Sequence, residues 1–584
     1  MRTLTHDVDL CLVGGGMAGL CAAVAAARHG ARVALVHDRP VLGGNASSEV
    51  RMHIGGAHGP HHRETGLLEE IELTNIARNP SASYAIWDSI LWECARREPG
   101  LTLILNASVN QAAMDGDRLA SVTAWQLTSE TWHVARAPLF GDCSGDSILA
   151  PLTGAEVRIG REARGEFGED IEPEQPDART MGMSCLIQAR ETDRPVPFVP
   201  PPWAKVYASD ADLPHRDHDH RRTNFWWLEL GGEQDTVHDA EALRDELLAA
   251  AFGVWDHIKN RGDHGAANWA LDWVGFLPGK RESRRYVGDH MLTQNDVRAE
   301  GRFDDLVAYG GWSMDDHHPG GLAWPGQPTI FHPAPSPFGI PYRCLYSRNI
   351  ANLFCAGRNI SATHAALSSS RVMATCAVLG QAMGTAAAIA AREGCGPRAV
   401  HEHHLRELQQ TLLDDDCWLP WQTRQVPALS RAAVLTASEG DPEPLRNGLD
   451  RPDGEVDHGW RGAPGSWIQY SFATPTAVSQ VRLVFDSDLN RRGKNMPCAW
   501  PRDPTTIASP GACQLHHPAP PTLVRAFRVE SLAADGAWAE VARVEDNHQR
   551  LVRVPLAVDT SALRVVLTAT WGAPDCHLFA CDVR

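Results

Sequence analysis

Short apolar runs alternate with turns of small residues near the start of the chain. Residues 9–13 form an apolar run of strand length, and residues 20–28 form an alanine-rich stretch of helical length. Residues 32–36 add a second apolar run. A strand, a helix and a second strand in this order predict a β-α-β unit.

Later runs extend this α/β pattern. Apolar or alternating segments predict strands at 101–105, 107–109, 121–126, 131–135, 138–141 and 352–355. Longer periodic segments predict helices at 67–77 and 371–392. The second helix is rich in alanine, and Gly380 and Gly384 would let another element pack closely against it.

The pattern changes again from about residue 432. Apolar and polar residues alternate at 466–472, 478–485, 525–530 and 563–567. Regular short strands separated by turns predict an all-β sandwich of the jelly-roll type over 432–584. Residues 416–431, which contain proline and arginine, are expected to be a linker.

The turn after the first strand has the glycine spacing of a dinucleotide-binding loop. Gly14, Gly16 and Gly19 form a Gly-x-Gly-x-x-Gly motif that also contains Met17 and Ala18. The first glycine permits the tight turn, the second lets a pyrophosphate approach, and the third lets the helix pack on the strand. Free N–H groups at the helix start favour the phosphate charge. An ordinary glycine turn is the alternative.

The end of the second strand departs from the usual dinucleotide pattern. An acid commonly binds the ribose hydroxyls there, but this chain has His37, followed by Asp38 and Arg39. Either Asp38 takes that role, or His37 binds the ribose as a neutral ligand. We include all three residues in the expected cofactor site.

A small-residue loop follows, made of Gly43, Gly44, Asn45, Ser47 and Ser48. With the glycine turn before it, this loop resembles the FAD-dependent oxidoreductases of the broad glutathione reductase and fumarate reductase type. In that family the loop lies near the flavin. The resemblance therefore implies FAD as the cofactor.

Two later segments strengthen the resemblance. Ser144-Gly145-Asp146 loosely matches the segment with which the family returns to FAD, and Ala-Gly-Arg before a long helix closely resembles its second FAD motif. In the family that helix start faces the flavin, where its dipole stabilises negative charge. The further residues placed at FAD are Val109, Gly357, Arg358, Val372, Met373 and Ala374.

The resemblance also implies the domain organisation. An α/β FAD-binding Rossmann-type domain would comprise 1–172 and 340–415, with an inserted α+β substrate domain at 173–339. The segment 432–584 resembles a discoidin-like, galactose-binding-type domain. Such domains bind glycans or brace their neighbour, and we favour bracing because residues 1–7 contain no apolar signal core.

Four residues are candidates for catalysis. His317 and His318 follow two aspartates, and histidine titrates in the range that suits a general base. Adjacent residues do not point the same way, so His317 is the first candidate and His318 the second. Arg281 could bind a carboxylate or a diol, shield the flavin pyrophosphate, or belong to a structural ion-pair network. His364 is a candidate for the flavin face.

Composition narrows the possible functions. The formal net charge of −18 argues against nonspecific binding to nucleic acid or to an anionic membrane. The 14 cysteines include no Cys-x-x-Cys pair, which fits a reducing compartment, so we expect a cytoplasmic protein. We expect no metal site, although His53, His58, His61 and His62 could form one. Covalent attachment of FAD through His53 is also open.

These observations favour a flavoenzyme that oxidises a CH–OH group by hydride transfer to flavin N5. The 19 tryptophans favour a carbohydrate or polyol-like substrate, because indole faces stack on sugars, although any single tryptophan can simply fill the core. Redox-neutral elimination or glycosidic cleavage through transient oxidation is an alternative, as is a non-catalytic flavin- or glycan-binding protein. The sequence identifies neither the electron acceptor nor the oligomeric state.

Overall fold

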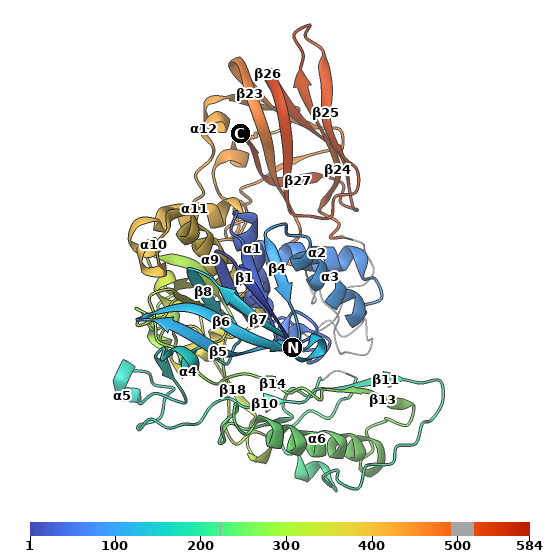
Figure 1. Cartoon of the computed structure of the whole chain (residues 1–584). Coiled ribbons are helices and arrows are strands. Elements are labelled where there is room, and N and C mark those ends of the chain that lie inside the picture. Colours follow the sequence, from blue (N-terminus) through green and yellow to red (C-terminus); the bar gives the residue numbers. More distant parts are fainter. Residues whose placement is uncertain (222–223, 492–518) are drawn as a thin grey trace. The chain divides into compact units, whose positions relative to one another are not determined.

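The computed structural model describes residues 1–221, 224–491 and 519–584 (Figure 1). Its described residues form two compact units. The α/β unit comprises 1–57 and 82–408, and the β unit comprises 58–81, 409–491 and 519–584. Residues 416–431, which we expected to form a linker, therefore belong to the β unit.

A five-stranded parallel sheet is the centre of the α/β unit. Its strand order is β20-β8-β2-β3-β4. The strands are β2 (Leu10–Val13), β3 (Val33–Val36), β4 (Leu101–Ile104), β8 (Leu139–Asp142) and β20 (Leu353–Cys355). Every residue of β2, β3, β8 and β20 is buried, as expected for a parallel sheet covered on both faces. The predicted α/β fold is confirmed.

Two glycine- and alanine-rich helices pack against each other in this unit, α1 (Met17–Arg28) and α9 (Met373–Glu393). A Cβ atom at Gly380 or at Gly384 would lie 2.1 Å from a backbone oxygen of α1, so only glycine permits this close packing. α9 is also long and apolar enough to cross a membrane, but 94% of its most apolar window is buried in the protein.

A second sheet has four strands in the order β1-β7-β6-β5. Its strands are β1 (Arg2–Asp7), β5 (Ala107–Asp115), β6 (Arg118–Gln126) and β7 (Thr131–Arg136). β5, β6 and β7 form the expected antiparallel meander, whereas β1 adds a parallel edge strand. β1 is mostly exposed and therefore has no apolar pattern that the sequence analysis could detect.

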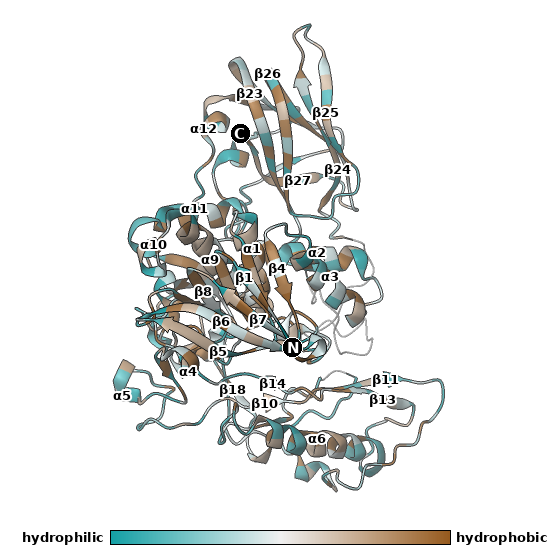
Figure 2. Ribbon diagram, viewed as in Figure 1, coloured by the Kyte–Doolittle hydropathy of each residue, from teal (hydrophilic) through white to brown (hydrophobic). Residues whose placement is uncertain are grey.

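Residues 173–339 contain short antiparallel strands around one long helix, α6 (Ala240–Asp256), which continues into the π-helical turn η4 (His257–Arg261). Teal and brown residues alternate along α6, whose apolar side joins a separate core (Figure 2). The strands of this region are β10 (Met183–Ser184), β11 (Ile187–Glu191), β12 (Glu229–Leu230), β13 (Trp269–Val274), β14 (Gly279–Lys280), β16 (Leu306–Gly310), β17 (Met314–His317), β18 (Thr329–His332) and β19 (Phe338–Pro341), with β15 (Arg285–Tyr286) pairing to β9 (Val157–Arg158).

Shorter helices complete the α/β unit. They are η1 (Gly44–Ala46), α3 (Tyr84–Arg96), η2 (Leu127–Ser129), α4 (Ala150–Thr153), α5 (Arg164–Phe167), η3 (Asp210–Asp212), α7 (Gln294–Arg298), η5 (Gly321–Ala323), η6 (Tyr342–Cys344), α8 (His364–Ser370) and α10 (Pro397–His403). The helix α11 (Leu405–Asp414) spans the point at which the chain passes into the β unit.

The β unit is built on a seven-stranded antiparallel sheet around one apolar core. Its strands are β21 (Val434–Ala437), β22 (Trp460–Gly462), β23 (Trp467–Phe485), β24 (Val524–Leu532), β25 (Trp538–Val544), β26 (Leu551–Thr570) and β27 (Cys576–Val583). The strands predicted at 466–472 and 478–485 are one long strand, β23, whose pairing with β26 is interrupted near residue 472. The predicted all-β class is confirmed.

Helices of the β unit include one from an early part of the sequence. They are α2 (Leu67–Arg78), α12 (Ala428–Ala432) and η7 (Glu443–Arg446). Glu69 of α2 accepts hydrogen bonds from the Ser487 hydroxyl at 2.5 Å and from the Arg491 guanidinium at 2.5 and 2.9 Å. All three side chains are buried. These contacts make α2 an integral part of the β unit.

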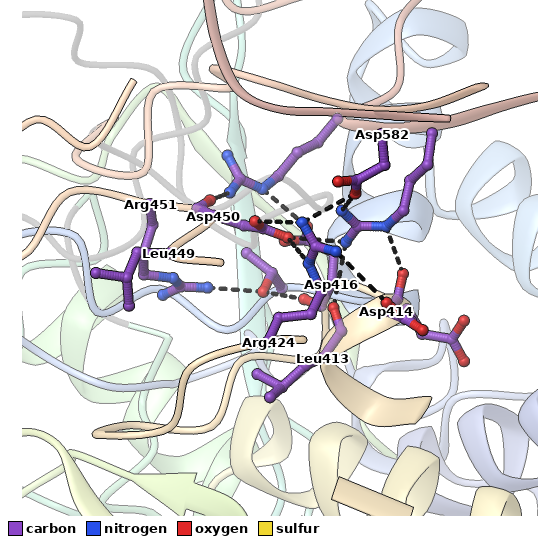
Figure 3. A network of polar contacts seen from close by, with 12 residues as sticks. Leu413, Asp414, Asp416, Arg424, Leu449, Asp450, Arg451 and Asp582 are labelled. Atoms are coloured by element: carbon purple, nitrogen blue, oxygen red, sulfur yellow. Dashed lines mark hydrogen bonds and ion pairs between the residues drawn. The ribbon is translucent and has the colours of Figure 1, made fainter. Parts of the chain in front are cut away.

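A ring of buried ion pairs joins distant segments of the β unit. Arg424 contacts both Asp450 and Asp582 at 2.9 Å, as Figure 3 shows. Arg482 contacts the same two carboxylates, at 2.9 and 3.4 Å. Buried charges are tolerated when each is paired. The ring therefore links β23 and β27 to the loops at 424 and 450.

Candidate active site

The α/β unit contains a cavity of about 540 Å³ that starts at the glycine turn. Most residues that the resemblance assigns to FAD line it: Gly14, Gly16, Met17, Ala18, His37, Asp38, Arg39, Gly43, Gly44, Asn45, Val109, Ser144, Gly145, Asp146, Gly357, Arg358, Val372 and Met373. The fold therefore brings together residues that are more than three hundred positions apart in the sequence.

Glycines form the floor of this cavity. Gly14 has a φ of 103°, and a Cβ there would lie 2.5 Å from the backbone of Cys143. Gly16 and Gly44 face each other, so that a Cβ at Gly44 would lie 3.1 Å from the Cα of Gly16. Among the described residues, no side chain caps the start of α1. The N–H groups of its first turn can therefore bind an anionic group.

The structure separates the roles of His37 and Asp38. The Nδ1 atom of His37 accepts a hydrogen bond from the Gly15 amide at 3.0 Å, and its Nε2 lies 3.1 Å from the carbonyl of Val41. Both ring nitrogens are therefore engaged within the protein. The Asp38 side chain is 59% exposed and lies on the cavity wall, where it can contact a ribose.

A cluster of charges also lines the cavity. Asp146 pairs with Lys280 at 2.9 Å and with Arg358 at 2.8 Å, and it accepts a hydrogen bond from Ser283 at 2.8 Å. Burial alone would raise the pKa of the Asp146 carboxyl, but the two cations outweigh it and hold the pKa well below its usual range. The cluster therefore carries a net positive charge.

Four expected cofactor residues do not line the cavity. A Cβ at Gly19 would lie 1.8 Å from the Gly14 carbonyl oxygen, so this glycine serves helix packing. Ser47 donates to the Gly44 carbonyl at 2.7 Å, and the Ser48 amide donates to Asp88 at 3.1 Å. The Ala374 amide donates to the Gly55 carbonyl at 2.9 Å. These residues shape the walls without facing the cavity.

His317, the first of the predicted catalytic residues, lines the cavity. It lies on β17, and its ring is held between two carboxylates. Its Nδ1 is 2.6 Å from Glu229, and its Nε2 is 3.3 Å from Asp315. The edge of the Trp226 ring contacts it at a centroid distance of 5.3 Å. These contacts fix the orientation of the imidazole.

Both carboxylates beside His317 are held in the ionised state. Burial would raise the pKa of Glu229, but Arg281 and His317 outweigh it and lower the pKa. Burial acts in the same direction on Asp315, and there His317 and Arg371 lower the pKa well below its usual range. The predicted residue Arg281 lines the cavity and lies 3.3 Å from Glu229.

His318 does not line the cavity, unlike our expectation for a second candidate base. Its ring stacks on Trp324 with a centroid distance of 4.0 Å, and its Nδ1 accepts a hydrogen bond from the Gly320 amide at 3.1 Å. Successive side chains along an extended segment point to opposite faces. The neighbour of His317 is therefore directed away from the cavity.

His364 also lies away from the cavity lining. It begins α8 and is 1% exposed, with Nδ1 2.8 Å from Glu282 and Nε2 3.2 Å from Asp316. Burial alone would lower the pKa of this imidazole, but the two carboxylates outweigh it and raise the pKa well above its usual value. His364 is thus a buried cation in an ion-pair network, and the network contributes to the support of β17.

Several lining residues were not candidates in the sequence analysis. They are Met52, Ser184, Trp226, Lys280, Trp312, Asp315, Phe331, Arg371 and Cys376. Asp315 could have been found, because residues two apart on a strand share a face and His317 lies on the same strand. Other tryptophans of this region, including Trp255 and Trp269, are buried in the core around α6.

Comparisons with known proteins identify a family and some distant structures. A family model described as FAD dependent oxidoreductase matches residues 9–412. The family 32 carbohydrate-binding module of Streptococcus pneumoniae EndoD is 14% identical, with 27% of this chain and 97% of that chain covered and a TM-score of 0.19. The myxobacterial FAD-dependent halogenase CndH is 17% identical, with 33% and 46% covered and a TM-score of 0.22. Because both TM-scores are below 0.5, we base the function on the family match and the cavity.

The cofactor is FAD, and the residues of the cavity fit it. The side-chain-free floor at Gly14, Gly16 and Gly44 gives a pyrophosphate access to the backbone. Arg39 Nη1 and Arg358 Nε are buried polar atoms without a hydrogen-bond partner among the described residues. Both arginines line the cavity, where an anionic group would satisfy them.

Proposed function

Because this chain belongs to the FAD dependent oxidoreductase family, we propose that it oxidises a CH–OH group of a carbohydrate or polyol-like substrate. The observation that carries the proposal is the position of His317, a base on the wall of the cavity that starts at the glycine turn. When bound, FAD supplies the oxidant, because flavin N5 accepts the C–H hydrogen together with its electron pair. A side chain of the protein must then accept the hydroxyl proton.

The chain's own residues hold the cofactor in this proposal. The first N–H groups of α1, at Met17 and Ala18, bind the pyrophosphate, and Asp38 binds the ribose hydroxyls. Arg39 and Arg358 add positive charge beside the phosphates. The start of α9, at Val372 and Met373, directs the positive end of its dipole into the cavity and favours negative charge there.

His317 acts as the general base through Nε2. An ionised Glu229 can only accept a hydrogen bond, so the nitrogen 2.6 Å from it, Nδ1, carries the ring hydrogen. In the neutral ring Nε2 takes the hydroxyl proton once the substrate hydroxyl has replaced Asp315, which lies 3.3 Å from this nitrogen. The resulting imidazolium is stabilised by Glu229 on one side and by Asp315 on the other.

The chemistry of the lining favours a polyhydroxylated substrate. Trp226, Trp312 and Phe331 offer apolar ring surfaces for the C–H faces of a sugar. Arg371 and Asp315 offer a donor and an acceptor for hydroxyl groups. A mixture of aromatic faces and a few charged groups is typical of sites that orient a small polar ligand.

Anaerobic bleaching of the flavin tests this proposal. The purified protein is mixed with a panel of monosaccharides, oligosaccharides and polyols, and the loss of oxidised flavin absorption is followed. We expect at least one compound to bleach the flavin. His317→Gln should lower that rate about 10²- to 10⁴-fold, the usual contribution of a general base. The flavin content should stay unchanged, because the substitution removes the base and leaves the cofactor contacts.

His318→Gln is the matched control, since it changes the adjacent histidine, which lies off the cavity wall. It should bleach at the wild-type rate. Equal rates for wild type and His317→Gln would contradict the role of His317. A product that accumulates in the absence of any electron acceptor would contradict net oxidation and favour redox-neutral elimination or glycosidic cleavage.

A further inference from the structure

Three histidines and one aspartate converge outside the cavity, beside the end of α6. They are Asp210 in η3, His218 in the loop that follows, His257 at the start of η4, and His264 beyond it. One potential ligand atom from each residue lies within 4.8 Å of those of the other three. The four positions have no regular spacing in the sequence, so the sequence analysis did not consider them.

Four of the six distances between these atoms are close to those of a tetrahedral zinc site. Nε2 of His257 lies 2.9 Å from Oδ1 of Asp210 and 3.1 Å from Nε2 of His264. Oδ1 of Asp210 lies 3.4 Å from Nε2 of His264 and 3.7 Å from Nδ1 of His218. Zinc–nitrogen bonds of about 2.0–2.1 Å in a tetrahedron place the ligand atoms about 3.3 Å apart. The four distances scatter around that value.

The hydrogen bonds of His257 direct a lone pair toward the centre of the cluster. Its Nδ1 lies 3.1 Å from the carbonyl of Tyr207, and a carbonyl can only accept, so Nδ1 carries the hydrogen. Nε2 is then the nitrogen that faces Asp210 and His264, so its lone pair is the one available to a metal ion at the centre of the cluster. A backbone carbonyl on the other nitrogen is the usual partner of a metal-bound histidine.

Burial also favours a bound ion. The side chains of His257, His218 and His264 are 0, 10 and 15% exposed, whereas that of Asp210 is 72% exposed. Nε2 of His218 is buried and has no hydrogen-bond partner among the described residues. The exposed side of Asp210 leaves a path for the ion. The π-helical form of η4, a rare geometry that is common at functional sites, presents His257.

We propose that Asp210, His218, His257 and His264 bind one Zn²⁺ ion. Four protein ligands complete the tetrahedron, which makes the site structural. None of the four residues lines the cavity. The ion joins the segment around 210–218 to the end of α6. Within that segment, the Asp217 carbonyl accepts a hydrogen bond from the indole of Trp227 at 3.1 Å. Trp227 is adjacent to Trp226, which lines the cavity, so the zinc site supports one wall of the cavity.

The test measures metal content in the full chain, purified without a histidine tag and dialysed against dilute ZnCl₂ and then against metal-free buffer. We expect about one zinc per chain by plasma emission, and a lower melting temperature after removal by a chelator. Cobalt loaded in its place should give the intense visible bands of a tetrahedral ion. Wild-type protein that retains no zinc under these conditions would overturn the proposal.

Two variants localise the ion. His264→Gln should retain at least 10-fold less zinc at equal free zinc, because one of four ligands is lost. His238→Gln is the matched control, since His238 is an exposed histidine 2.7 Å from Asp235 in the same region and is not part of the cluster. It should bind zinc as the wild type does. Equal zinc contents in wild type and His264→Gln would also overturn the proposal.

Discussion

The alternation of side chains along β17 decides the role of each residue in the His317 region. Asp315 and His317 are two residues apart and share the face that lines the cavity. Asp316, between them, points the other way and meets the buried His364. One four-residue strand therefore carries both a histidine that lines the cavity and the aspartate that contacts the buried His364. The start of α8, which carries His364, is contacted by the buried carboxylates of Glu162, Glu172 and Glu282.

Glu172 belongs to that buried group, and its protonation should make stability depend on pH. Its carboxylate accepts a hydrogen bond from the Ala365 amide at 2.8 Å, and burial raises its pKa from 4.5 to about 7. Between these two pH values the folded state retains a proton that the unfolded chain has lost. Stability from this group is therefore greatest below pH 4.5 and falls, by up to roughly 3 kcal/mol, as the pH rises to about 7.

Glu172→Gln should flatten this dependence, since glutamine does not titrate. Melting temperatures at pH 5 and pH 8 measure the effect, and the difference between them should be smaller in the variant than in the wild type. Glu174→Gln is the control, because its side chain is 77% exposed in the same segment. A wild-type pH dependence in Glu172→Gln would show that Glu172 is ionised in the folded protein across this range.

At the scale of elements, the contact between α1 and α9 holds the cofactor turn against the second FAD segment. Gly380 lies against Ala18, which lines the cavity, and Gly384 lies against Ala22. Because these two glycines have no side chains, the backbones of α1 and α9 come into van der Waals contact. The interface therefore couples helix packing to the shape of the cofactor site.

Gly380→Ala should both destabilise the protein and weaken FAD retention. Its Cβ would lie 2.1 Å from the Ala18 carbonyl oxygen, and overpacking of this kind costs about 1–3 kcal/mol. The measurements are the melting temperature and the ratio of flavin to protein after gel filtration. Gly165→Ala, a helical position with nothing within 4 Å of the added Cβ, should change neither. Unchanged flavin retention in Gly380→Ala would contradict the coupling.

The elements that the sequence predicted best are those with continuous burial. β2, β3, β8 and β20 appear within one or two residues of the predicted runs, because a parallel strand buried on both faces must be apolar throughout. The exposed edge strand β1 has no such pattern. Glu229 and the proposed zinc ligands were beyond prediction, because tertiary folding alone brings Glu229 to His317 and Asp210 to His257.

At the scale of the whole molecule, buried charges define the β unit. Arg482 is 1% exposed, pairs with Asp450 and Asp582, and also donates to the carbonyls of Leu413 and Asp414. Removal of one partner from a buried pair leaves the other charges uncompensated. The assembly of this unit from distant segments therefore depends on a few arginines.

Arg482→Met should destabilise the β unit by about 3–5 kcal/mol, the usual cost of breaking a buried ion pair. Arg543→Met is the control, since the Arg543–Glu540 pair is exposed by 49 and 39% and should change stability by less than about 1 kcal/mol. Chemical denaturation followed by tryptophan fluorescence compares the two. Equal midpoints would contradict a structural role for the ring.

The membership of residues 58–81 in the β unit has a consequence for any attempt to shorten the gene. A fragment that ends near residue 415 would appear to be a self-sufficient flavoenzyme, because the family match stops at 412. That fragment would still carry α2, whose Glu69 would have lost Arg491. The segment from about residue 416 to the carboxy terminus is therefore not an independent domain. A single backbone cut within 416–431 should leave two pieces that stay associated until they are denatured.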